Sequence, residues 1–539
     1  MSDVWWCPTC IVPLLRNKCE NCGSKITKPF AKDIMPVFAE EMSLLRNKLF
    51  FKQLPATPRD FFLWTSGLYY YINGQRVAKL HYNNSNNPTL NISLPQNFKI
   101  PNWKKKPLNS YIHTLYNANR SSIDKIEYEA MQFIKATFAK YPQHVVMVAF
   151  SGGKDSTVIS EVVRKALGKS SILHIMSDTT IEASDTYDYI EKFHKHNPKI
   201  PLVKLSPTMD FYEVCTKIGP PSRLRRWCCT THKASQMATI VTALRESSPG
   251  VLTFEGVRSS ESPRRASYDR ISIKHKIKGE VVGRPIQSWL SIHVWLYILV
   301  HGLDFNDGYR YGFRRIGCLP CPFNSRWSNY LTAIHYRDKD QQWRRFLYEH
   351  AKRVGHPNPK HFSEEGWETR AGGRGQNNEV TKLSKEICLV QDNAYTYTLL
   401  NLSDSILEYI KPFGSLNVLQ DDGIILKGAL VSKNELVANI KIVRPKKTIR
   451  IEFQSLKPGK MKTLVSRFER QLKKYQTCIL CGSCNMNCIM SAINANGKYI
   501  IDECKCTHCL QCVRSKCIAL DSLSVSDRRT TWETCNGSD

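Results

Sequence analysis

The cysteines constrain this chain more than any other feature, because they occur in groups. Of the twenty, four lie between residues 7 and 22, four lie in two pairs at 228–229 and 318–321, and nine lie between 478 and 517. In a reducing compartment, closely spaced cysteines hold metal ions or iron–sulfur clusters far more often than they form disulfides. The sequence therefore predicts three separate metal-binding regions.

Length and composition predict a soluble, cytoplasmic protein of several domains. The 539 residues are 42% hydrophobic and 23% charged, which is enough to bury several cores. The longest apolar stretch, 294–300, is far shorter than the roughly 20 residues of a membrane span, and the N-terminus lacks the pattern of a secretory signal. We expect no membrane partner. The net charge of +30 favours a polyanionic partner, although basic surfaces also serve solubility.

Sequence patterns divide the chain into six predicted units. Asn73-Gly74 between two strand-like runs is typical of a type I′ hairpin turn. Strand and helix patterns then alternate to about residue 330, which indicates an α/β fold with a parallel sheet. The predicted units are a ribbon at 1–28, a small β-containing module at 29–120, the α/β domain at 121–335, a flexible polar connection at 336–384, a small β-rich domain at 385–475 and a cysteine-rich domain at 476–525.

The stretch 441–475 is strongly basic, with twelve Lys or Arg residues against two acidic ones. Basic patches are the electrostatic mark of nucleic-acid binding. A solvated linker helix is the alternative interpretation, and the sequence does not separate the two.

A glycine-rich turn follows the buried-strand pattern at 145–150 and precedes a helix-compatible run. Such a turn presents backbone N–H groups and a helix dipole to a phosphate. Its glycines allow close approach of the backbone, its lysine adds charge and its hydroxyls can donate to phosphate oxygens. The spacing differs from that of a Walker loop. The candidate phosphate-binding residues are Ser151, Gly152, Gly153, Lys154, Asp155, Ser156 and Thr157.

The run from Ser151 to Ser156 resembles the PP-loop of the ATP pyrophosphatase superfamily, whose members cleave ATP between the α and β phosphates and adenylate a substrate. Ser177-Asp178-Thr179-Thr180 is similar to a segment that faces the nucleotide in relatives of phosphoadenosine-phosphosulfate (PAPS) reductase, with Thr180 in place of a glycine. The segment from Gly256 to Arg265 looks like a third motif of that family. The resemblance covers about residues 125–330.

This resemblance implies an enzyme that binds ATP and Mg²⁺. It implies Lys154, Asp155 and Arg258 as catalytic residues, and it adds Asp178, Arg258 and Arg265 to the ATP site. Guanidinium groups suit phosphate because they bind it in a bidentate manner. Either Asp155 or Asp178 would hold the metal.

The middle cysteines, Cys228, Cys229, Cys318 and Cys321, combine an adjacent pair with a distant Cys-x2-Cys. This arrangement resembles the one by which adenylyl-sulfate reductases and DNA-phosphorothioation ATP pyrophosphatases hold one [4Fe–4S] cluster. Four thiolates also suit zinc, but adjacent cysteines disfavour an ordinary zinc ribbon.

The C-terminal cysteines follow a doubled spacing that resembles a two-cluster bacterial ferredoxin, in which the fourth cysteine of each run binds the other cluster. The resemblance assigns Cys478, Cys481, Cys484 and Cys517 to one [4Fe–4S] cluster, and we call these residues the first C-terminal set. It assigns Cys488, Cys506, Cys509 and Cys512 to a second [4Fe–4S] cluster, and we call them the second C-terminal set. Two departures are a longer last spacing and no proline after either fourth cysteine. Cys504 is a spare, and structural zinc is the alternative.

The ribbon cysteines, Cys7, Cys10, Cys19 and Cys22, form two paired knuckles that suit a structural Zn²⁺ ion. Such a ribbon binds nucleic acid, binds protein or only holds a chain terminus.

Three functions fit these patterns. The first is an ATP pyrophosphatase that adenylates a nucleic-acid group for sulfur insertion, as in the DNA-phosphorothioation enzymes that the chain resembles; it implies DNA, a cysteine desulfurase as sulfur donor and other phosphorothioation proteins as partners. The second is a phosphoadenylyl- or adenylyl-sulfate reductase that makes sulfite, but the Glu-Cys-Gly-Leu-His segment of those enzymes is missing from the sequence. The third is a tRNA-thiolating or non-catalytic RNA-binding protein.

Overall fold

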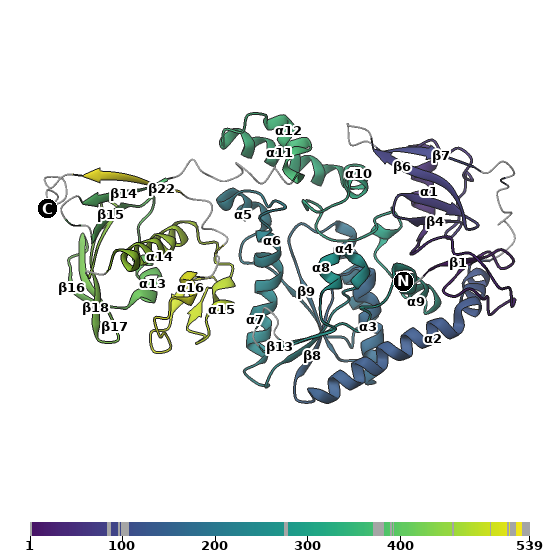
Figure 1. Ribbon diagram of the computed structural model, residues 1–539, viewed down its shortest axis with the longest axis horizontal. Helices are drawn as coiled ribbons and strands as arrows, with labels where there is room; N and C mark the ends of the chain where they lie inside the picture. Colours follow the sequence, from purple (N-terminus) through teal and green to yellow (C-terminus); the bar gives the residue numbers. More distant parts are fainter. Residues whose placement is uncertain are drawn as a thin grey trace.

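The computed structural model describes residues 3–82, 88–94, 98, 107–273, 277, 279–369, 382–388, 391, 393–454, 457–495, 497–514, 517 and 524–530. Along the longest axis, a C-terminal sheet unit, a central α/β domain and an N-terminal β module follow one another (Figure 1). Within the described residues, no helix is both long enough and apolar enough to cross a membrane.

The central domain is built on a six-stranded sheet with the order β10-β9-β8-β11-β13-β12. Every pairing from β10 to β13 is parallel and only the short β12 runs antiparallel, which confirms the predicted fold class. The strands are β8 (Val145–Ala149), β9 (Leu173–Ser177), β10 (Leu202–Leu205), β11 (Val251–Phe254), β12 (Ile271–Ser272) and β13 (Glu280–Gly283). The helices are α2 (Leu108–Lys140), α3 (Lys154–Leu167), α4 (Ser184–His196), α5 (Phe211–Ile218), α6 (Trp227–Cys229), α7 (Ser235–Leu244), α8 (Pro263–Ala266) and α9 (Ser291–Val300).

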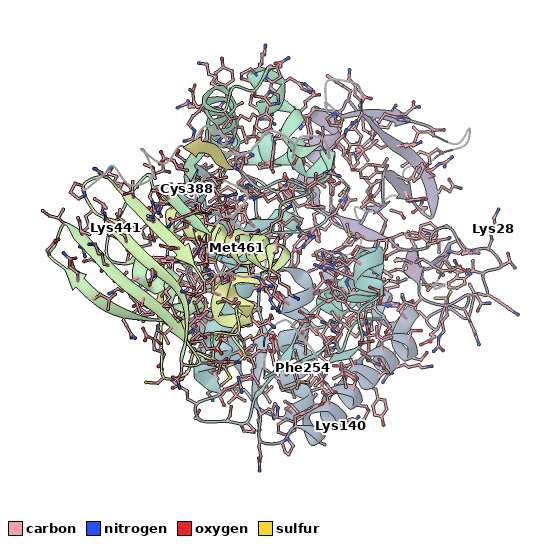
Figure 2. All side chains as sticks on the ribbon, turned by 60° about the vertical axis from the view of Figure 1, so that its left-hand side comes forward. Lys28, Lys140, Phe254, Cys388, Lys441 and Met461 are labelled. Carbon is pink, nitrogen blue, oxygen red and sulfur yellow. The ribbon has the colours of Figure 1, made fainter. Side chains whose placement is uncertain are left out.

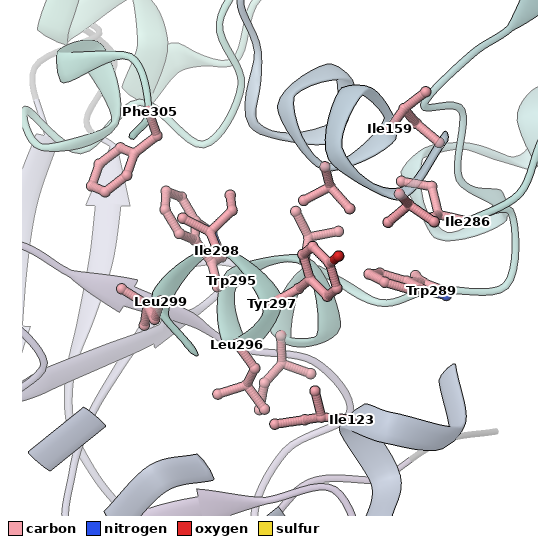
Figure 3. Packing of buried hydrophobic residues seen from close by; sticks show 14 of the residues in the cluster. Ile123, Ile159, Ile286, Trp289, Trp295, Leu296, Tyr297, Ile298, Leu299 and Phe305 are labelled. Atoms are coloured by element: carbon pink, nitrogen blue, oxygen red, sulfur yellow. The ribbon is translucent and has the colours of Figure 1, made fainter. Parts of the chain in front are cut away.

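The apolar stretch at 294–300 forms most of α9, which is buried on nearly every side. A helix that is hydrophobic all round belongs in the interior of a protein. Ile123 of α2 and Ile159 of α3 lie on different sides of it, and Trp289 covers its start (Figure 3). This helix therefore joins α2 to the central sheet.

The N-terminal ribbon consists of β1 (Trp5–Cys7), β2 (Val12–Leu14) and the loops that carry its cysteines. It packs on α2, where the Asn119 amide donates to the carbonyl of Pro13 (2.9 Å) and accepts from the backbone N–H of Leu15 (2.8 Å). The ribbon is thus fixed to the side of α2.

The predicted β module is a five-stranded antiparallel sheet with the order β3-β4-β5-β6-β7, next to α1 (Ala39–Asn47). Its strands are β3 (Met35–Val37), β4 (Leu63–Ser66), β5 (Tyr69–Ile72), β6 (Gln75–Tyr82) and β7 (Pro88–Ile92). Asn73 and Gly74 both have positive φ (52° and 73°), as a type I′ turn requires. The hairpin prediction is therefore confirmed.

The predicted flexible connection at 336–384 is wrong for its first half. After α10 (Arg326–His335), residues 337–368 form α11 (Arg337–Arg353), α12 (Pro359–Glu364) and a 3₁₀ turn (Gly366–Glu368). Trp343, Leu347, Phe362 and Trp367 are buried in one cluster with α5 and α6. The high charge of this segment concealed a widely spaced apolar face. The glycine-rich stretch 371–378 lies outside the described residues.

The C-terminal unit contains a seven-stranded sheet with the order β16-β17-β18-β19-β15-β14-β22. Its elements are β14 (Lys382–Cys388), β15 (Ala394–Thr398), α13 (Ile406–Ile410), β16 (Ser415–Asp421), β17 (Ile425–Ser432), β18 (Glu435–Val443), β19 (Thr448–Phe453), α14 (Pro458–Thr477) and β22 (Ser524–Thr530). Met461 on α14 and Lys441 on β18 are both seen in this unit (Figure 2). The basic stretch 441–475 is thus two strands and a helix, part of it packed on the sheet.

Residues 478–517, which we call the C-terminal cysteine module, lie between α14 and β22. They contain α15 (Ser483–Asn487), β20 (Ile493–Asn494), β21 (Ile500–Ile501) and α16 (Gln511–Arg514). After the module, β22 pairs in parallel with β14. The module is therefore inserted between two elements of one β unit.

Candidate active site at the carboxyl edge of the central sheet

The topology of the central sheet places a binding site beside β8. From β8 the chain proceeds outward through β9 to β10, then crosses back to β11 on the other side of β8. Ligands of open α/β sheets bind at such a switch point, beyond the carboxyl ends of the strands. The glycine-rich loop follows β8, Asp178 follows β9 and Arg258 follows β11. The fold thus brings the three predicted motifs to one edge.

The loop after β8 is braced by its own hydroxyl groups. Gly152 has a φ of +71°, which favours glycine, and a Cβ there would approach Ile190 and Thr186 of α4 to 3.3 Å. The Ser156 hydroxyl donates to the carbonyl of Gly153 (2.8 Å) and accepts from the backbone N–H of Ser151 (3.2 Å). Thr157 also donates to the Gly153 carbonyl (3.2 Å). Ser156 and Thr157 therefore hold the loop's shape, a role that the sequence did not indicate.

Lys154, Asp155 and Arg258 form a buried charged trio at the start of α3. One Asp155 oxygen lies 2.7 Å from Lys154 Nζ and the other lies 2.6 Å from Arg258 Nε. The side chains of Lys154 and Arg258 are only 3% and 4% exposed. Burial alone would raise the pKa of Asp155, but the charges of Lys154 and Arg258 outweigh it and lower that pKa. Asp155 thus positions two cations beside the loop instead of offering an open carboxylate to Mg²⁺.

Gly256 and Tyr309 support this trio and were not predicted as site residues. A Cβ on Gly256 would come within 2.8 Å of the Asp155 backbone. A glycine is therefore needed at this position for the loop after β11 to pack against the start of α3. The buried Tyr309 hydroxyl accepts the backbone N–H of Lys154 (3.0 Å). Tyr309 lies 155 residues from its partner, and no local pattern marks it.

The other predicted nucleotide-site residues are placed as follows. Asp178 is buried, accepts the Tyr187 hydroxyl (2.7 Å) and lies 3.1 Å from Lys204 Nζ. Arg265 contacts Glu261, whose carboxylate also accepts the backbone N–H of Arg258 (3.0 Å). Arg265 thus acts on the trio through Glu261 in this structure.

Thr180 occupies the position where the family pattern has glycine, and its φ is +63°. This region is strained for a β-branched residue. Its hydroxyl accepts the backbone N–H of Phe211 (3.0 Å), and its own N–H donates to Asp178 (2.7 Å). The backbone has kept the glycine-type turn although the side chain has changed.

The middle cysteines meet next to this edge. Cys228 and Cys229 form α6, which continues through a π-helical turn (Thr230–Ala234) into α7. The Cys318 sulfur lies 3.4 Å from the Thr179 hydroxyl, in the segment that follows β9. The nearby thiols of Cys229, Cys318 and Cys321, together with burial, raise the pKa of Cys228. The structure thus brings all four middle cysteines together within reach of the candidate nucleotide site.

The ribbon cysteines fit a single metal ion. Their four sulfur atoms lie within 4.8 Å of one another, a separation that tetrahedral Zn–S bonds of about 2.3 Å permit. Among the residues that the structure describes, no other group brings three metal-ligating side chains so close.

The C-terminal cysteines gather in two neighbouring regions of the module. Cys488, Cys506, Cys509 and Cys512 line one small cavity. In the first C-terminal set, Cys481 and Cys517 pack against the same apolar cluster, while Cys478 and Cys484 lie in the cluster that adjoins the second set. Cys504 is exposed and lines neither region. The assignment of these cysteines to two sets and the metal content of each set remain predictions.

Comparisons with known proteins agree with this site. Residues 145–324 match the phosphoadenosine phosphosulfate reductase domain family. An uncharacterized protein of Methanocaldococcus jannaschii is 35% identical over 253 residues, which are 47% of this chain and 50% of that protein. The chain thus spans about half the length of this archaeal relative. The adenosine 5′-phosphosulfate reductase of Staphylococcus haemolyticus is 25% identical over 232 residues, 40% of this chain and 91% of that enzyme.

Two solved structures show weaker similarity. PAPS reductase from Candida auris has a TM-score of 0.28 and 17% identity, over 36% of this chain and 93% of that one. The U34-tRNA thiolase of Methanococcus maripaludis, solved with its [4Fe–4S] cluster, has a TM-score of 0.28 and 15% identity, over 47% of this chain and 82% of that one.

The chain is therefore similar to PAPS reductases over residues 145–324, and this part contains the phosphate loop, Asp178, Arg258 and the four middle cysteines.

Proposed function

We propose that this enzyme cleaves ATP between the α and β phosphates and adenylates a nucleic-acid group for sulfur insertion. The observation that carries the proposal is the intact loop from Ser151 to Thr157, with two buried cations held beside it by Asp155. Such preorganised positive charge stabilises the charge that develops on a transferring phosphoryl group. The reaction class therefore follows from the site, and the substrate is inferred from other features.

In the proposed reaction, a substrate oxygen attacks the α-phosphorus of ATP and pyrophosphate leaves. A sulfur nucleophile then attacks the activated atom, and AMP departs with the displaced oxygen. Lys154 and Arg258 neutralise charge on the α-phosphate and the leaving pyrophosphate, and Mg²⁺ enters as the counterion of ATP. Gly152 and Gly153 let the loop backbone approach the phosphates.

The middle cysteines would hold a [4Fe–4S] cluster beside this site. When bound, such a cluster supplies electron-transfer capacity near the nucleotide. Cys318, next to Thr179, is the middle cysteine that contacts the segment after β9.

The nucleic-acid partner is supported by charge. The chain carries 77 basic and 47 acidic residues, and Arg467, Arg470 and Arg514 converge where α14 meets α16. DNA phosphorothioate is the product that we would look for first, with sulfur from a cysteine desulfurase and with other phosphorothioation proteins as partners. Thiolated tRNA is the alternative product of the same chemistry.

A reductase of adenylyl sulfate or PAPS is the second candidate, and the similarity to adenosine 5′-phosphosulfate reductase supports it. Against it, the sequence contains no Glu-Cys-Gly-Leu-His segment. The phosphate loop of this chain is also intact, which suits ATP. The substrate of such a reductase, by contrast, has no pyrophosphate to release.

The test is anaerobic turnover by the purified, cluster-loaded enzyme. We expect pyrophosphate release from ATP that depends on nucleic acid, and phosphorothioate dinucleotides in digests of DNA from cells that express the gene. Thiolated nucleosides in tRNA without any in DNA would redirect the proposal to RNA. Reduction of adenylyl sulfate without ATP turnover would overturn it.

A further inference from the structure

The C-terminal cysteine module packs directly against the part of the central domain that carries the middle cysteines. Ile479 is buried in one apolar cluster with Phe211 of α5 and Trp227 of α6. Cys228 and Cys318 of the middle set pack against this cluster, and so do Cys481 and Cys517 of the first C-terminal set. Two cysteine sets far apart in sequence therefore border the same core.

Buried apolar side chains lie at the centre of the contact. Ile479, Trp227 and Phe211 are 4%, 1% and 0% exposed, and the rings of Phe211 and Trp227 stack at 5.4 Å. The module's helix α15 also contacts the π-helical turn that follows Cys229, and α7 beyond it. Beside this core, a cavity separates Ile479 and Cys481 of the module from His232 and Gln236 of the central domain.

The opposite end of the module faces solvent. Cys509 of the second C-terminal set is exposed, and Ile489 and Met490 beside that set are 64% and 46% exposed. The first and second C-terminal sets adjoin each other within one apolar cluster. The three cysteine sets therefore follow one another from the surface at Cys509 to the nucleotide-site edge at Cys318.

We infer that the module is an electron-delivery arm for the centre held by the middle cysteines, and that Ile479 and Trp227 are the positioning residues of the contact. A low-potential one-electron donor would give up one electron at the Cys509 end. Cys228 and Cys318 would help to hold the centre that accepts this electron, and no bond would form or break. The inference holds for either reaction proposed above, because it concerns the electron route and not the substrate.

The experiment uses the full-length, cluster-loaded protein, reduced anaerobically with dithionite and studied by electron paramagnetic resonance. We expect the reduced wild type to show spin–spin interaction between the module and the middle centre. The Cys318→Ser variant, which lacks a ligand of the middle centre, should show the module's spectrum without that interaction. A wild-type spectrum equal to the sum of isolated centres would overturn the inference.

Ile479→Asp tests the contact itself, and Ile500→Asp is the matched control. Ile500 lies in the same module but is 41% exposed. We expect Ile479→Asp to lose the spin–spin interaction and to become sensitive to proteolysis within the C-terminal cysteine module, with iron content retained; Ile500→Asp should behave as wild type. If Ile479→Asp does not hold iron, the milder Ile479→Ala takes its place.

An interaction that persists in an Ile479 variant whose module has become protease-sensitive would contradict the assigned positioning role. Pyrophosphate release, measured in parallel, tests the proposed function separately. If Ile479→Asp loses the magnetic interaction but keeps ATP turnover, the electron route is supported, and it is separate from the ATP reaction.

Discussion

Single side chains decide how the phosphate loop is charged. Asp155 holds Lys154 and Arg258 through its two oxygens at 2.7 and 2.6 Å, so the cations approach the loop as a fixed pair. Two like charges in a buried site repel each other unless an anion lies between them. An incoming triphosphate would share this role with Asp155. The residue therefore prepares the site for a polyanion instead of acting on it directly.

We expect Lys154→Ala and Arg258→Ala each to lower the rate of pyrophosphate release by about 10²-fold or more, because each removes preorganised charge from the α-phosphate. Steady-state turnover with ATP measures this effect. Lys165→Ala is the control, because Lys165, in the last turn of α3, pairs with Glu127 of α2 and not with the trio. Wild-type turnover in both site variants would show that the trio is structural only.

Thr180 allows a prediction on stability. Because its φ is +63°, we expect Thr180→Ala to be less stable than Thr180→Gly by about 1 kcal/mol, since both lose the bond to Phe211 but only alanine keeps the strain. Urea unfolding measures the difference. At Thr137, in the interior of α2, the same two substitutions should rank in the opposite order, because glycine weakens a helix. An equal ranking at both sites would refute the strain argument.

Among the elements, the loop from Tyr309 to Cys318 links the β module to the active site. Glu41 of α1 is fully buried and binds Arg314 through both oxygens (2.8 and 2.5 Å). It also accepts the Tyr70 hydroxyl (2.9 Å). Earlier in the same loop, the Tyr309 hydroxyl accepts the backbone N–H of Lys154. The carbonyl of the next residue, Arg310, accepts the backbone N–H of Glu41. The β module therefore supports the active-site loop from behind.

We expect Glu41→Gln to destabilise the protein by about 3 kcal/mol, because it leaves the Arg314 guanidinium without its anion in a mostly buried site. The double variant Glu41→Leu/Arg314→Leu should recover much of that loss, since removing both charges also removes the desolvation cost. Chemical denaturation of the single and double variants provides the measurement. A double variant as unstable as Glu41→Gln would mean that packing, not charge, accounts for the effect.

The motifs that could be predicted from sequence are those in which function depends on consecutive residues. The loop at 151–157, the hairpin at Asn73-Gly74 and the cysteine runs all carry their geometry in local spacing. The role of Tyr309 depends on a tertiary contact, which no local pattern encodes. Ser156 and Thr157 brace the loop through local hydrogen bonds, but in the sequence a bracing hydroxyl looks the same as one that donates to a phosphate. The helices at 337–368 are not predicted from sequence because charged residues separate Trp343, Leu347 and Trp367. The fold nevertheless buries all three in one cluster.

For the whole molecule, some of the excess basic residues have structural partners and others do not pair with an acid among the described residues. Arg444 pairs with Asp404 and Asp421, and Lys474 is buried against Tyr499. By contrast, no acidic partner within the described residues pairs with Arg467 or Arg514. Burial and the charges of Arg514 and Arg470 lower the pKa of Arg467. The basic stretch therefore contains both cations with structural partners and Arg467, which we propose as part of the nucleic-acid contact.

We expect replacement of Arg467, Arg470 and Arg514 by Gln to weaken nucleic-acid binding and to reduce the slope of log K against log salt by about three, roughly one for each lost phosphate contact. Titrations at several salt concentrations measure the slope. Lys165→Gln/Lys192→Gln/Arg444→Gln removes the same net charge from acid-paired cations and should change it less. Equal slopes in the two triple variants would assign binding to net charge alone.

The return of β22 to β14 has a mechanical consequence. The cysteine module leaves the C-terminal unit at the end of α14 and rejoins it at β22, so both of its ends are secured to one sheet. A segment held at two points cannot swing between distant partners as a domain on a single hinge does. We therefore expect an external electron donor to diffuse to the module. The rate of electron transfer into the module would then depend on the concentration of that donor and not on a domain rotation.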